Sequence, residues 1–445
     1  MRFGTDGVRG VANSELTVEF AVSLGRAAAR VLGGEKFLIG RDTRRSGTML
    51  EAALAAGICA EGLSVEMLGV LPTPAVATLS ALDGHPAAMI SASHNPFADN
   101  GIKLFAAGGR KLSDAVQRHL EAEIERLASA GAGGDAPTGP GVGVISHVEG
   151  SATARYEASV LDALEGRTLD GLSVALDCAN GANTDLAAEV FARAGATVSV
   201  MGDRPNGVNI NDGCGSTHPE GLQAAVVGSG ADLGFAFDGD ADRVLAVDAR
   251  GELVDGDQLI AVCAIDLRAR GLLRGNAVVV TVMSNLGFRT GMAAAGIEVV
   301  ETAVGDRYVL EALDEGNFSL GGEQSGHLIF SDLTTTGDGL LSALIVADIV
   351  KRSGRALADL TADAMQRLPQ VLQNVRLTDR PADLLDRIAP EVAAVEAELG
   401  DTGRLLIRPS GTEPLIRVMI EAPDPDLAQR LTTSVCDALV AAAAR

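Results

Sequence analysis

Apolar runs typical of strands alternate with alanine-rich helical patterns in three stretches of the chain. In the first stretch, the pattern predicts a buried strand at 37–40, a helix at 49–61 and a second strand at 63–68. The same order recurs in the second and third stretches, whose first strands are predicted at 173–177 and 277–283. Strands that alternate with helices at this spacing indicate βαβ units and a parallel sheet. We therefore predict three tandem α/β domains of like topology, with mixed and largely parallel sheets.

Each stretch continues to a third short apolar run that stops at a dense polar motif. The runs AAMI, LGFAF and FSL lead into SASHNP (91–96), DGDADR (238–243) and GGEQSGH (321–327). In open α/β sheets, ligands bind outside the carboxyl ends of the strands. Polar loops follow strands in many proteins, but three motifs of such unusual composition at equivalent positions indicate a site. We expect the three loops to face one central cleft.

The remainder of the chain has a different pattern, which predicts a smaller α+β domain. A strand is predicted at 371–377, a helix at 382–399, a hairpin at 403–422 and a closing helix at 427–444. The glycine-rich stretch 129–143 is interpreted as a flexible surface linker. The predicted domains are 1–150, 151–248, 249–366 and 367–445.

Composition narrows the class of protein. A length of 445 residues suits about three domains of ~150 residues, with four also compatible. The formal net charge of −23 argues against nucleic-acid binding, because an acidic chain repels a phosphate backbone. The five scattered cysteines argue against a disulfide framework and a zinc site, and suit a reducing compartment. The glycine-rich start and the short apolar runs predict a cytoplasmic protein without a membrane segment.

The motif DGDADR carries the strongest chemical signal. The three carboxylates of Asp238, Asp240 and Asp242 can converge on one hard cation if the backbone forms a tight loop. Oxygen ligands favour Mg²⁺, Ca²⁺ or Mn²⁺. An EF-hand is excluded because its sixth position needs glycine, where Arg243 stands, and its twelfth needs glutamate, where Ala249 stands. The alternative is an acidic solvated turn, but three packed acids repel each other unless a cation neutralises them.

The motif SASHNP offers two hydroxyls and an imidazole in a loop stiffened by Pro96. A hydrolase would place its serine in a G-x-S-x-G elbow, which the sequence lacks. A serine that carries a phosphoryl group fits better, because its charge would complete a metal site with the aspartates. A turn or a helix cap explains the motif equally well.

Three further polar segments are candidates for ligand binding. RPSGTEP (408–414), with Arg417 beyond it, has the small residues and arginines of a phosphate-binding loop, although a simple hairpin turn is as plausible. GGEQSGH has the carboxylate, amide, hydroxyl and imidazole that a polyhydroxylated ligand requires, and a surface turn is again the alternative. Charged groups also occur in the opening GTDGVR, at Lys103 and in the segment 305–307. Taken singly, such a group more often belongs to a solvated loop than to a binding site.

The five motifs FGTDGVRG, SASHNP, DGDADR, GEQSGH and RPSGTEP, in this order, resemble the α-D-phosphohexomutase superfamily over essentially the whole chain. The resemblance implies four domains, a phosphoserine at Ser93, and one Mg²⁺ held by that phosphoserine together with Asp238, Asp240 and Asp242. The predicted catalytic residues are Ser93, Arg9, His94, Lys103, Arg243 and His327. The predicted substrate-binding residues are Gly305, Asp306, Arg307, Glu323, Ser325, Arg408, Ser410, Gly411, Thr412 and Arg417.

The opening motif, the glutamine of GEQSGH and the segment VGDRYV are most similar to the bacterial branch that acts on glucosamine phosphates. That similarity implies conversion of glucosamine 6-phosphate to glucosamine 1-phosphate through a 1,6-bisphosphate, with glucosamine or glucose 1,6-bisphosphate as activator. Lys103 or His327 would act as the general base, and a lysine there would need a lowered pKa. Activity on mannose or glucose phosphates and a non-catalytic sugar-phosphate binder are the alternatives. The chain could also form a homodimer.

Overall fold

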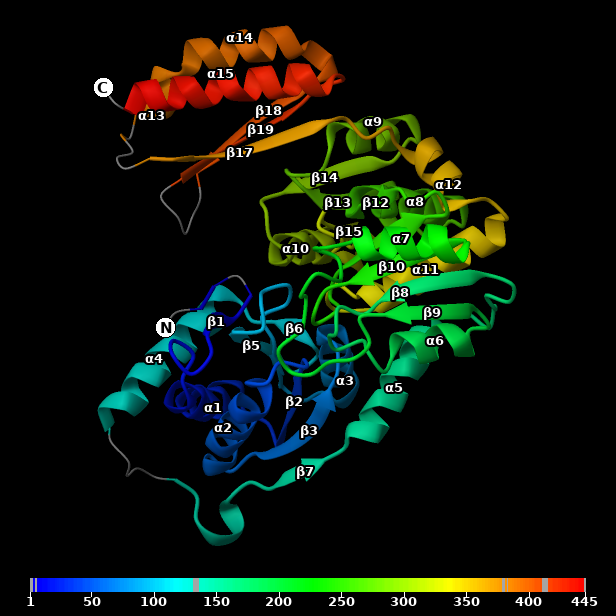
Figure 1. Cartoon of the computed structure of the whole chain (residues 1–445). Coiled ribbons are helices and arrows are strands. Elements are labelled where there is room, and N and C mark those ends of the chain that lie inside the picture. Colours follow the sequence, from blue (N-terminus) through cyan, green and yellow to red (C-terminus); the bar gives the residue numbers. More distant parts are fainter. Residues whose placement is uncertain are drawn as a thin grey trace. The chain divides into compact units, whose positions relative to one another are not determined.

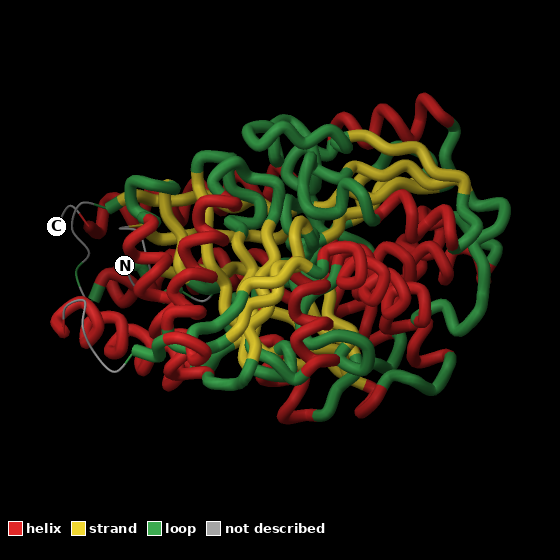
Figure 2. Tube along the Cα trace, turned by 90° about the horizontal axis from the view of Figure 1, so that it is seen from below, coloured by secondary structure: helices red, strands yellow, loops and turns green. Residues whose placement is uncertain are grey.

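The computed structural model describes residues 3–4, 6–130, 136–377, 381, 383–409 and 415–443. The chain divides into two compact units, Met1–Met283 with Ile297–Ala362, and Ser284–Gly296 with Asp363–Arg445. Figure 1 labels the elements along the chain, and Figure 2 shows strands gathered into sheets with helices packed outside them. Within the described residues, no helix has both the length and the apolar character needed to cross a bilayer.

The first sheet of the larger unit has the strand order β1-β5-β4-β2-β3-β7, with β6 paired to β5. Its strands are β1 (Val8–Val11), β2 (Lys36–Arg41), β3 (Ser64–Val70), β4 (Ala87–Ile90), β5 (Asp99–Ala106), β6 (Arg110–Lys111) and β7 (Ile145–His147). The accompanying helices are α1 (Val18–Leu32), α2 (Gly47–Ala60), α3 (Thr73–Asp83), α4 (Asp114–Ala130), η1 (Gly139–Gly141) and α5 (Glu149–Asp162). Helices α1 and α2 pack closely because Gly57 lacks a side chain; a Cβ there would lie 2.2 Å from the Val22 carbonyl oxygen.

The second sheet has the order β12-β11-β10-β8-β9 and the third has the order β14-β13-β15-β16. The second sheet consists of β8 (Ser173–Asp177), β9 (Thr197–Met201), β10 (Leu233–Phe237), β11 (Val244–Asp248) and β12 (Leu253–Val254). The third consists of β13 (Ala277–Thr281), β14 (Glu298–Thr302), β15 (Leu320–Gly322) and β16 (Leu328–Phe330). The helices of this region are α6 (Ala187–Arg193), α7 (Glu220–Ser229), α8 (Gly256–Ala269), η2 (Arg274–Asn276), α10 (Asp306–Gly316), α11 (Gly339–Ser353) and α12 (Leu357–Ala364).

The three sheets share one four-stranded kernel, which confirms the predicted repeat. The kernels are β3-β2-β4-β5, β9-β8-β10-β11 and β14-β13-β15-β16, each with three parallel strands and a fourth that runs antiparallel. In the first two copies, the polar motif lies in the connection between the third and the fourth strand; in the last copy, it begins within the third strand and fills the connection that follows. The chain therefore presents three loops of different chemistry from equivalent positions. The domain boundaries stay predictions.

Two local expectations need correction. The third run of the last repeat was expected at FSL, but β15 covers Leu320–Gly322 and so includes the first glycines of the motif. The stretch 129–143 is not a free linker throughout, because the Gly143 amide donates to the Cys59 carbonyl at 3.0 Å and β7 then pairs with β3. Residues 131–135 lie outside the described residues.

The smaller unit contains an antiparallel sheet of order β17-β19-β18 whose inner face is covered by helices. Its elements are α9 (Leu286–Ala294), β17 (Gln370–Arg376), α13 (Leu384–Arg387), α14 (Ala389–Leu399), η3 (Gly400–Thr402), β18 (Arg404–Pro409), β19 (Leu415–Glu421) and α15 (Pro425–Ala443). The predicted single helix at 382–399 is two helices. Pro390 has no amide hydrogen to donate, so it stands in the first turn of α14 and not inside a longer helix.

Candidate active site

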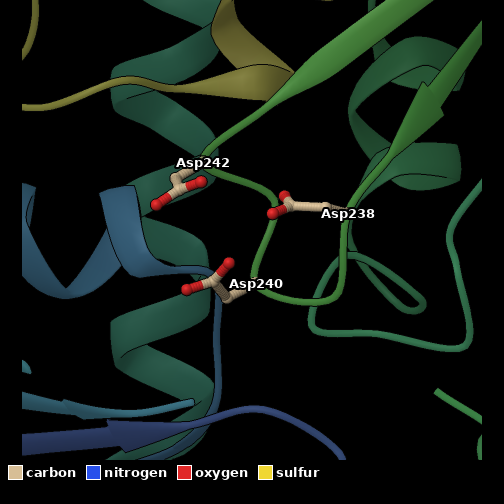
Figure 3. A group of neighbouring side chains, drawn as sticks. All are labelled: Asp238, Asp240 and Asp242. Atoms are coloured by element: carbon tan, nitrogen blue, oxygen red, sulfur yellow. The ribbon is translucent and has the colours of Figure 1, made fainter. Parts of the chain in front are cut away.

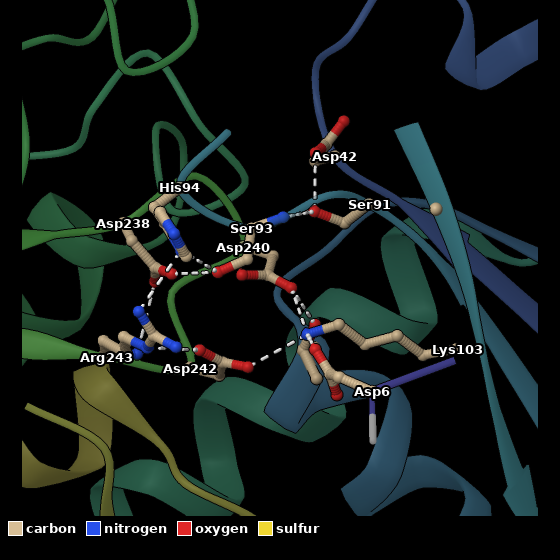
Figure 4. Close-up of polar contacts among 12 residues, drawn as sticks. Asp6, Asp42, Ser91, Ser93, His94, Lys103, Asp238, Asp240, Asp242 and Arg243 are labelled. Carbon is tan, nitrogen blue, oxygen red and sulfur yellow. Dashed lines mark hydrogen bonds and ion pairs between the residues drawn. The ribbon is translucent and has the colours of Figure 1, made fainter. Parts of the chain in front are cut away.

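The serine loop of the first repeat meets the acidic loop of the second. Ser93 follows β4 and its side chain is 1% exposed. Its Oγ donates to Asp238 Oδ2 at 2.5 Å (Figure 4). Ser91 instead supports the loop, because its Oγ donates to Asp42 at 2.7 Å and accepts from the Ser93 amide at 2.9 Å. The geometry thus separates the two serines and places Ser93 against the carboxylates.

Three aspartates converge in the loop between β10 and β11. One carboxylate oxygen each from Asp238, Asp240 and Asp242 lies within 4.8 Å of the others, and all three residues are buried. The carboxylates point toward a common space (Figure 3). The loop can approach the serine because Gly239 has no side chain; a Cβ there would lie 2.7 Å from the Ser93 carbonyl oxygen.

The carboxylates fit a divalent cation of the hard, oxygen-preferring kind. The Oδ1 atoms of Asp240 and Asp242 are buried and find no hydrogen-bond partner among the described residues. Burial, with the charges of Asp242 and Asp240, raises the pKa of Asp238 to about 7. Orphaned acceptors and mutual repulsion are both relieved when a cation binds the three oxygens. The residues present therefore fit a metal site.

Lys103 on β5 inserts a positive charge beside this group. Its Nζ lies 2.8 Å from Asp240, 3.0 Å from Asp242 and 3.0 Å from Asp6. Burial disfavours the ammonium, but these carboxylates raise the pKa of Lys103 well above its usual value. This shift of the Lys103 pKa is opposite in direction to the lowered pKa that a lysine base requires. The role of Lys103 as the base stays a prediction.

Thr73 contacts the acidic loop, and no motif in the sequence indicates this contact. It begins α3 in the first repeat, and its Oγ1 donates to Asp240 Oδ2 at 2.6 Å. Its amide also donates to the Asp240 carbonyl at 2.9 Å. Thr73 thereby holds both the backbone and the side chain of Asp240.

A chain of alternating charges continues from the acidic loop to the third repeat. Lys111 lies 2.6 Å from Asp6 and also contacts Asp306, the first residue of α10. His327 Nε2 lies 3.4 Å from Asp306, and His327 Nδ1 lies 3.7 Å from Asp242. Burial opposes charging of the imidazole, but Asp242 and Asp306 raise the pKa of His327. The three repeats are thus linked by ion pairs around the site.

His94 and Arg243 lie on the other side of Ser93. His94 Nδ1 is 3.4 Å from Ser93 Oγ and 3.2 Å from Arg243 Nη1. Burial, Arg243 and Arg9 lower the pKa of His94 to about 4, so the imidazole is neutral at physiological pH. Arg9 donates to Asp6. The guanidinium of Arg243 therefore contacts the imidazole that adjoins the serine, and the charge of Arg9 also acts on that imidazole.

A cavity of about 440 Å³ opens beside these groups. Its walls are Gly4, Asp6, Gly7, Arg9, Asp242, Arg243, Val304, Gly305, Asp306, Glu323 and His327. Of the residues predicted from the sequence, Arg9 of the first repeat and four residues of the third repeat line this cavity, whereas Ser93 and His94 are not part of its wall. Lys103 is 2% exposed and lies outside this wall. Arg307 pairs with Asp114 instead, and Ser325 is solvent-exposed on its loop.

The predicted phosphate-binding arginines lie in the smaller unit. Arg408 on β18 faces Arg417 on β19 in the strand register. Burial and the charge of Arg417 lower the pKa of Arg408. Like charges directly opposite each other destabilise a strand pair, so an anion between them would be stabilising. Ser410, Gly411 and Thr412 lie outside the described residues.

Four family models together match nearly the whole chain. Residues 1–130, 154–251 and 255–368 match the alpha/beta/alpha domains I, II and III of phosphoglucomutase/phosphomannomutase, and 372–438 match its C-terminal domain. The protein therefore belongs to the phosphohexomutase family, whose members are intramolecular phosphotransferases of the isomerase class, and it is such an enzyme.

Individual relatives agree with this assignment. The chain is 54% identical to phosphoglucosamine mutase of Rhodococcus opacus over 437 residues, which covers 96% of this chain and 97% of the relative. It is 52% identical to phosphoglucosamine mutase of Mycolicibacterium paratuberculosis over 448 residues, 99% of each chain. A phosphoglucomutase/phosphomannomutase family structure from Burkholderia thailandensis has a TM-score of 0.82 at 26% identity, covering 98% and 97% of the two chains.

A more distant structure shares the fold. Aspergillus fumigatus N-acetylphosphoglucosamine mutase, solved with GlcNAc-6P and magnesium, has a TM-score of 0.69 at 20% identity. The match covers 98% of this chain and 96% of that chain.

Proposed function

We propose that the protein is a phosphoglucosamine mutase, which interconverts glucosamine 6-phosphate and glucosamine 1-phosphate and thereby supplies amino sugar for cell-wall precursors. The observation that carries the proposal is the 2.5 Å contact between Ser93 Oγ and Asp238, which belongs to the same acidic loop as the cavity-lining residues Asp242 and Arg243. A serine in this position can hold a phosphoryl group between a carboxylate-bound cation and two arginines. Full-length relatives at 52–54% identity with this activity support the choice of sugar.

The reaction proceeds in two phosphoryl transfers. Phosphoserine at Ser93 gives its phosphoryl group to the free hydroxyl of the sugar phosphate, which forms a 1,6-bisphosphate and frees the serine oxygen. The bisphosphate reorients, and its other phosphoryl group returns to Ser93. A bisphosphate of glucosamine or glucose would act as activator because it can reload a serine that has lost its phosphate.

The residues around Ser93 divide the work of each transfer. Asp238, Asp240 and Asp242 would hold one Mg²⁺, which neutralises charge on the transferring phosphoryl oxygens when bound. Arg243 and Arg9, which line the cavity, would donate hydrogen bonds to those oxygens.

The proton of the sugar hydroxyl goes to Lys103 or His327 in this proposal. His327 lines the cavity, whereas Lys103 is not part of its wall and contacts Asp240 and Asp242. A general base must reach the hydroxyl within hydrogen-bond distance, directly or through one water. His327 is favoured because it lines the cavity that a sugar would enter. Lys103 is favoured because it contacts Asp240 and Asp242, two of the three aspartates that would hold the cation.

Recognition of the sugar is assigned to two places. Glu323 lines the cavity beside Gly305, whose amide donates to Glu323 Oε1 at 3.2 Å, and Ser325 follows on the same loop. These groups would bind hydroxyl and amino substituents. The loop from Arg408 to Thr412, with Arg417, would hold the phosphate that does not react in a given half-reaction.

The experiment that tests the proposal is a comparison of kcat/KM for glucosamine, mannose and glucose 6-phosphates, with and without bisphosphate activator. We expect the highest value for glucosamine 6-phosphate. Preference for mannose or glucose phosphate would support the alternative, a phosphomannomutase or phosphoglucomutase, the two activities for which the matching family models are named. Ser93→Ala should lose activity and the phosphopeptide seen by mass spectrometry. Turnover by Ser93→Ala equal to that of the wild type would refute the phosphoserine mechanism.

A further inference from the structure

A buried arginine in the first repeat holds the backbone of the serine loop. Arg44 lies in the turn between β2 and α2 and is 1% exposed. Its Nη2 donates to the carbonyls of Ser93 and Asn95, both at 2.8 Å. Its Nη1 donates to the carbonyl of Asp99 at 3.0 Å and to that of Pro96. One guanidinium therefore binds four carbonyl oxygens across seven residues.

An asparagine from the second repeat binds two of the same carbonyls. Asn211 is 7% exposed, and its Nδ2 donates to the Ser93 carbonyl at 2.9 Å and to the Asn95 carbonyl at 3.1 Å. Each of these two oxygens thus accepts one bond from Arg44 and one from Asn211, which uses both of its lone pairs. We call Arg44 and Asn211 the carbonyl clamp.

The clamp acts where the backbone is strained. Ser93 has a φ of 53°, in the left-handed region that non-glycine residues rarely adopt. Such a conformation persists only when surrounding contacts over-determine it. The conformation turns Ser93 Oγ toward Asp238, while Ser91, which is bound to Asp42, accepts a hydrogen bond from the Ser93 amide. The clamp therefore stabilises the backbone geometry that aims the serine oxygen at the acidic loop.

We propose that the carbonyl clamp is a positioning device for phosphoryl transfer, which fixes the distance and angle between the phosphoserine and the acidic loop. The proposal rests on the proposed function. Arg44 contributes geometry and not charge, because Asp42 neutralises it through a fully buried pair at 2.8 Å. Neither Arg44 nor Asn211 is part of the cavity wall, so loss of the clamp should slow transfer and leave sugar-phosphate binding intact.

The test compares Arg44→Lys and Asn211→Ala with the matched control Arg45→Lys. Arg44→Lys keeps the charge facing Asp42, but one ammonium cannot span four carbonyls. Arg45 is exposed next to it, so the control makes the same chemical change outside the clamp. Because a misplacement of about 1 Å can cost about 100-fold in rate, we expect each clamp variant to lower kcat by about 10- to 100-fold. KM should stay within about twofold, and Arg45→Lys should match the wild type.

Two readouts separate positioning from a general loss of structure. The rate at which glucose 1,6-bisphosphate phosphorylates Ser93, followed by mass spectrometry, should fall with kcat, and the affinity of the dephosphorylated protein for Mn²⁺ should not change. Variants that keep kcat within twofold, or that raise KM with kcat unchanged, would overturn the clamp. If Arg44→Lys fails to fold, the values of kcat, KM and the Ser93 phosphorylation rate measured for Asn211→Ala test the proposal in its place. A wild type that isomerises none of the three sugar phosphates would refute the proposed function, a result distinct from failure of the clamp.

Discussion

Replacement of Lys103 by methionine tests the charge balance of the site. Methionine keeps an unbranched apolar stem but removes the ammonium that lies within 3.0 Å of Asp6, Asp240 and Asp242. The Lys103 side chain is 3% exposed, so water has little access to solvate the carboxylates that lose their partner. Removal of one partner from a buried ion pair costs about 3–5 kcal/mol. We expect K103M to lower the free energy of unfolding by about that amount in the absence of divalent cations.

The assay is urea unfolding followed by circular dichroism, in EDTA and in excess MgCl₂. The cation would supply positive charge to Asp240 and Asp242, so Mg²⁺ should recover part of the loss in K103M. The loss should also be smaller at pH 5 than at pH 8, because the uncompensated carboxylates take up protons as the pH falls. Lys36→Met is the control, since Lys36 pairs with Glu66 at the surface, where solvent screening leaves an ion pair with little effect on stability.

Two results would refute this reasoning. K103M could be as stable as the wild type in EDTA at pH 8, which would mean that the three carboxylates do not need the ammonium. Alternatively, Mg²⁺ could stabilise K103M no more than it stabilises Lys36→Met, which would mean that the cation binds away from these carboxylates.

Three further predictions follow from the site and its surroundings. The pKa of Asp238 is raised to about 7, so below that pH a cation must displace the proton of this carboxyl group. We therefore expect the Mn²⁺ affinity, measured by calorimetry, to fall about tenfold per pH unit below about pH 7. A constant affinity between about pH 5.5 and 7 would contradict this. Arg417→Ala should raise KM about 10- to 100-fold, the cost of one charge-assisted hydrogen bond, with Ser93 phosphorylation unchanged; equal KM values would count against the phosphate assignment. Tyr156→Phe should lower the free energy of unfolding by about 1.5–3 kcal/mol, because the buried Tyr156 hydroxyl donates to Asp338 at 2.9 Å; a change below 0.5 kcal/mol in urea unfolding would disprove it.

The sequence was informative where chemistry is local. Strand and helix periodicity located the three repeats, since each kernel is built from short segments that follow one another. The DGDADR motif indicated a cation site because its three carboxylates lie within five residues. Ser93 could be preferred over Ser91 from the family resemblance, but the physical distinction needed the contacts of Asp42 and Asp238, which lie 49 and 145 residues away.

The residues that the sequence did not reveal act across the repeats. Thr73 and Asp240 are 167 residues apart, and Asn211 and Ser93 are 118 apart. No periodic pattern encodes such pairs, because Thr73 and Asn211 lie outside the motifs whose composition indicated the site. Asp6 was visible in the opening motif, but its contacts to Lys103 and Lys111 depend on how β1 pairs with β5.

The contacts of Asp240 have a consequence for any attempt to transplant the cation site. Its counter-charge, Lys103, and its hydroxyl donor, Thr73, both come from the first repeat, although Asp240 belongs to the second. A peptide or an isolated second repeat would carry all three acidic ligands without either partner. Such a fragment would relieve its repulsion by taking up protons or by unfolding the turn. The charge balance of the acidic loop is therefore a property that the repeats acquire on assembly, and the DGDADR motif does not carry it on its own.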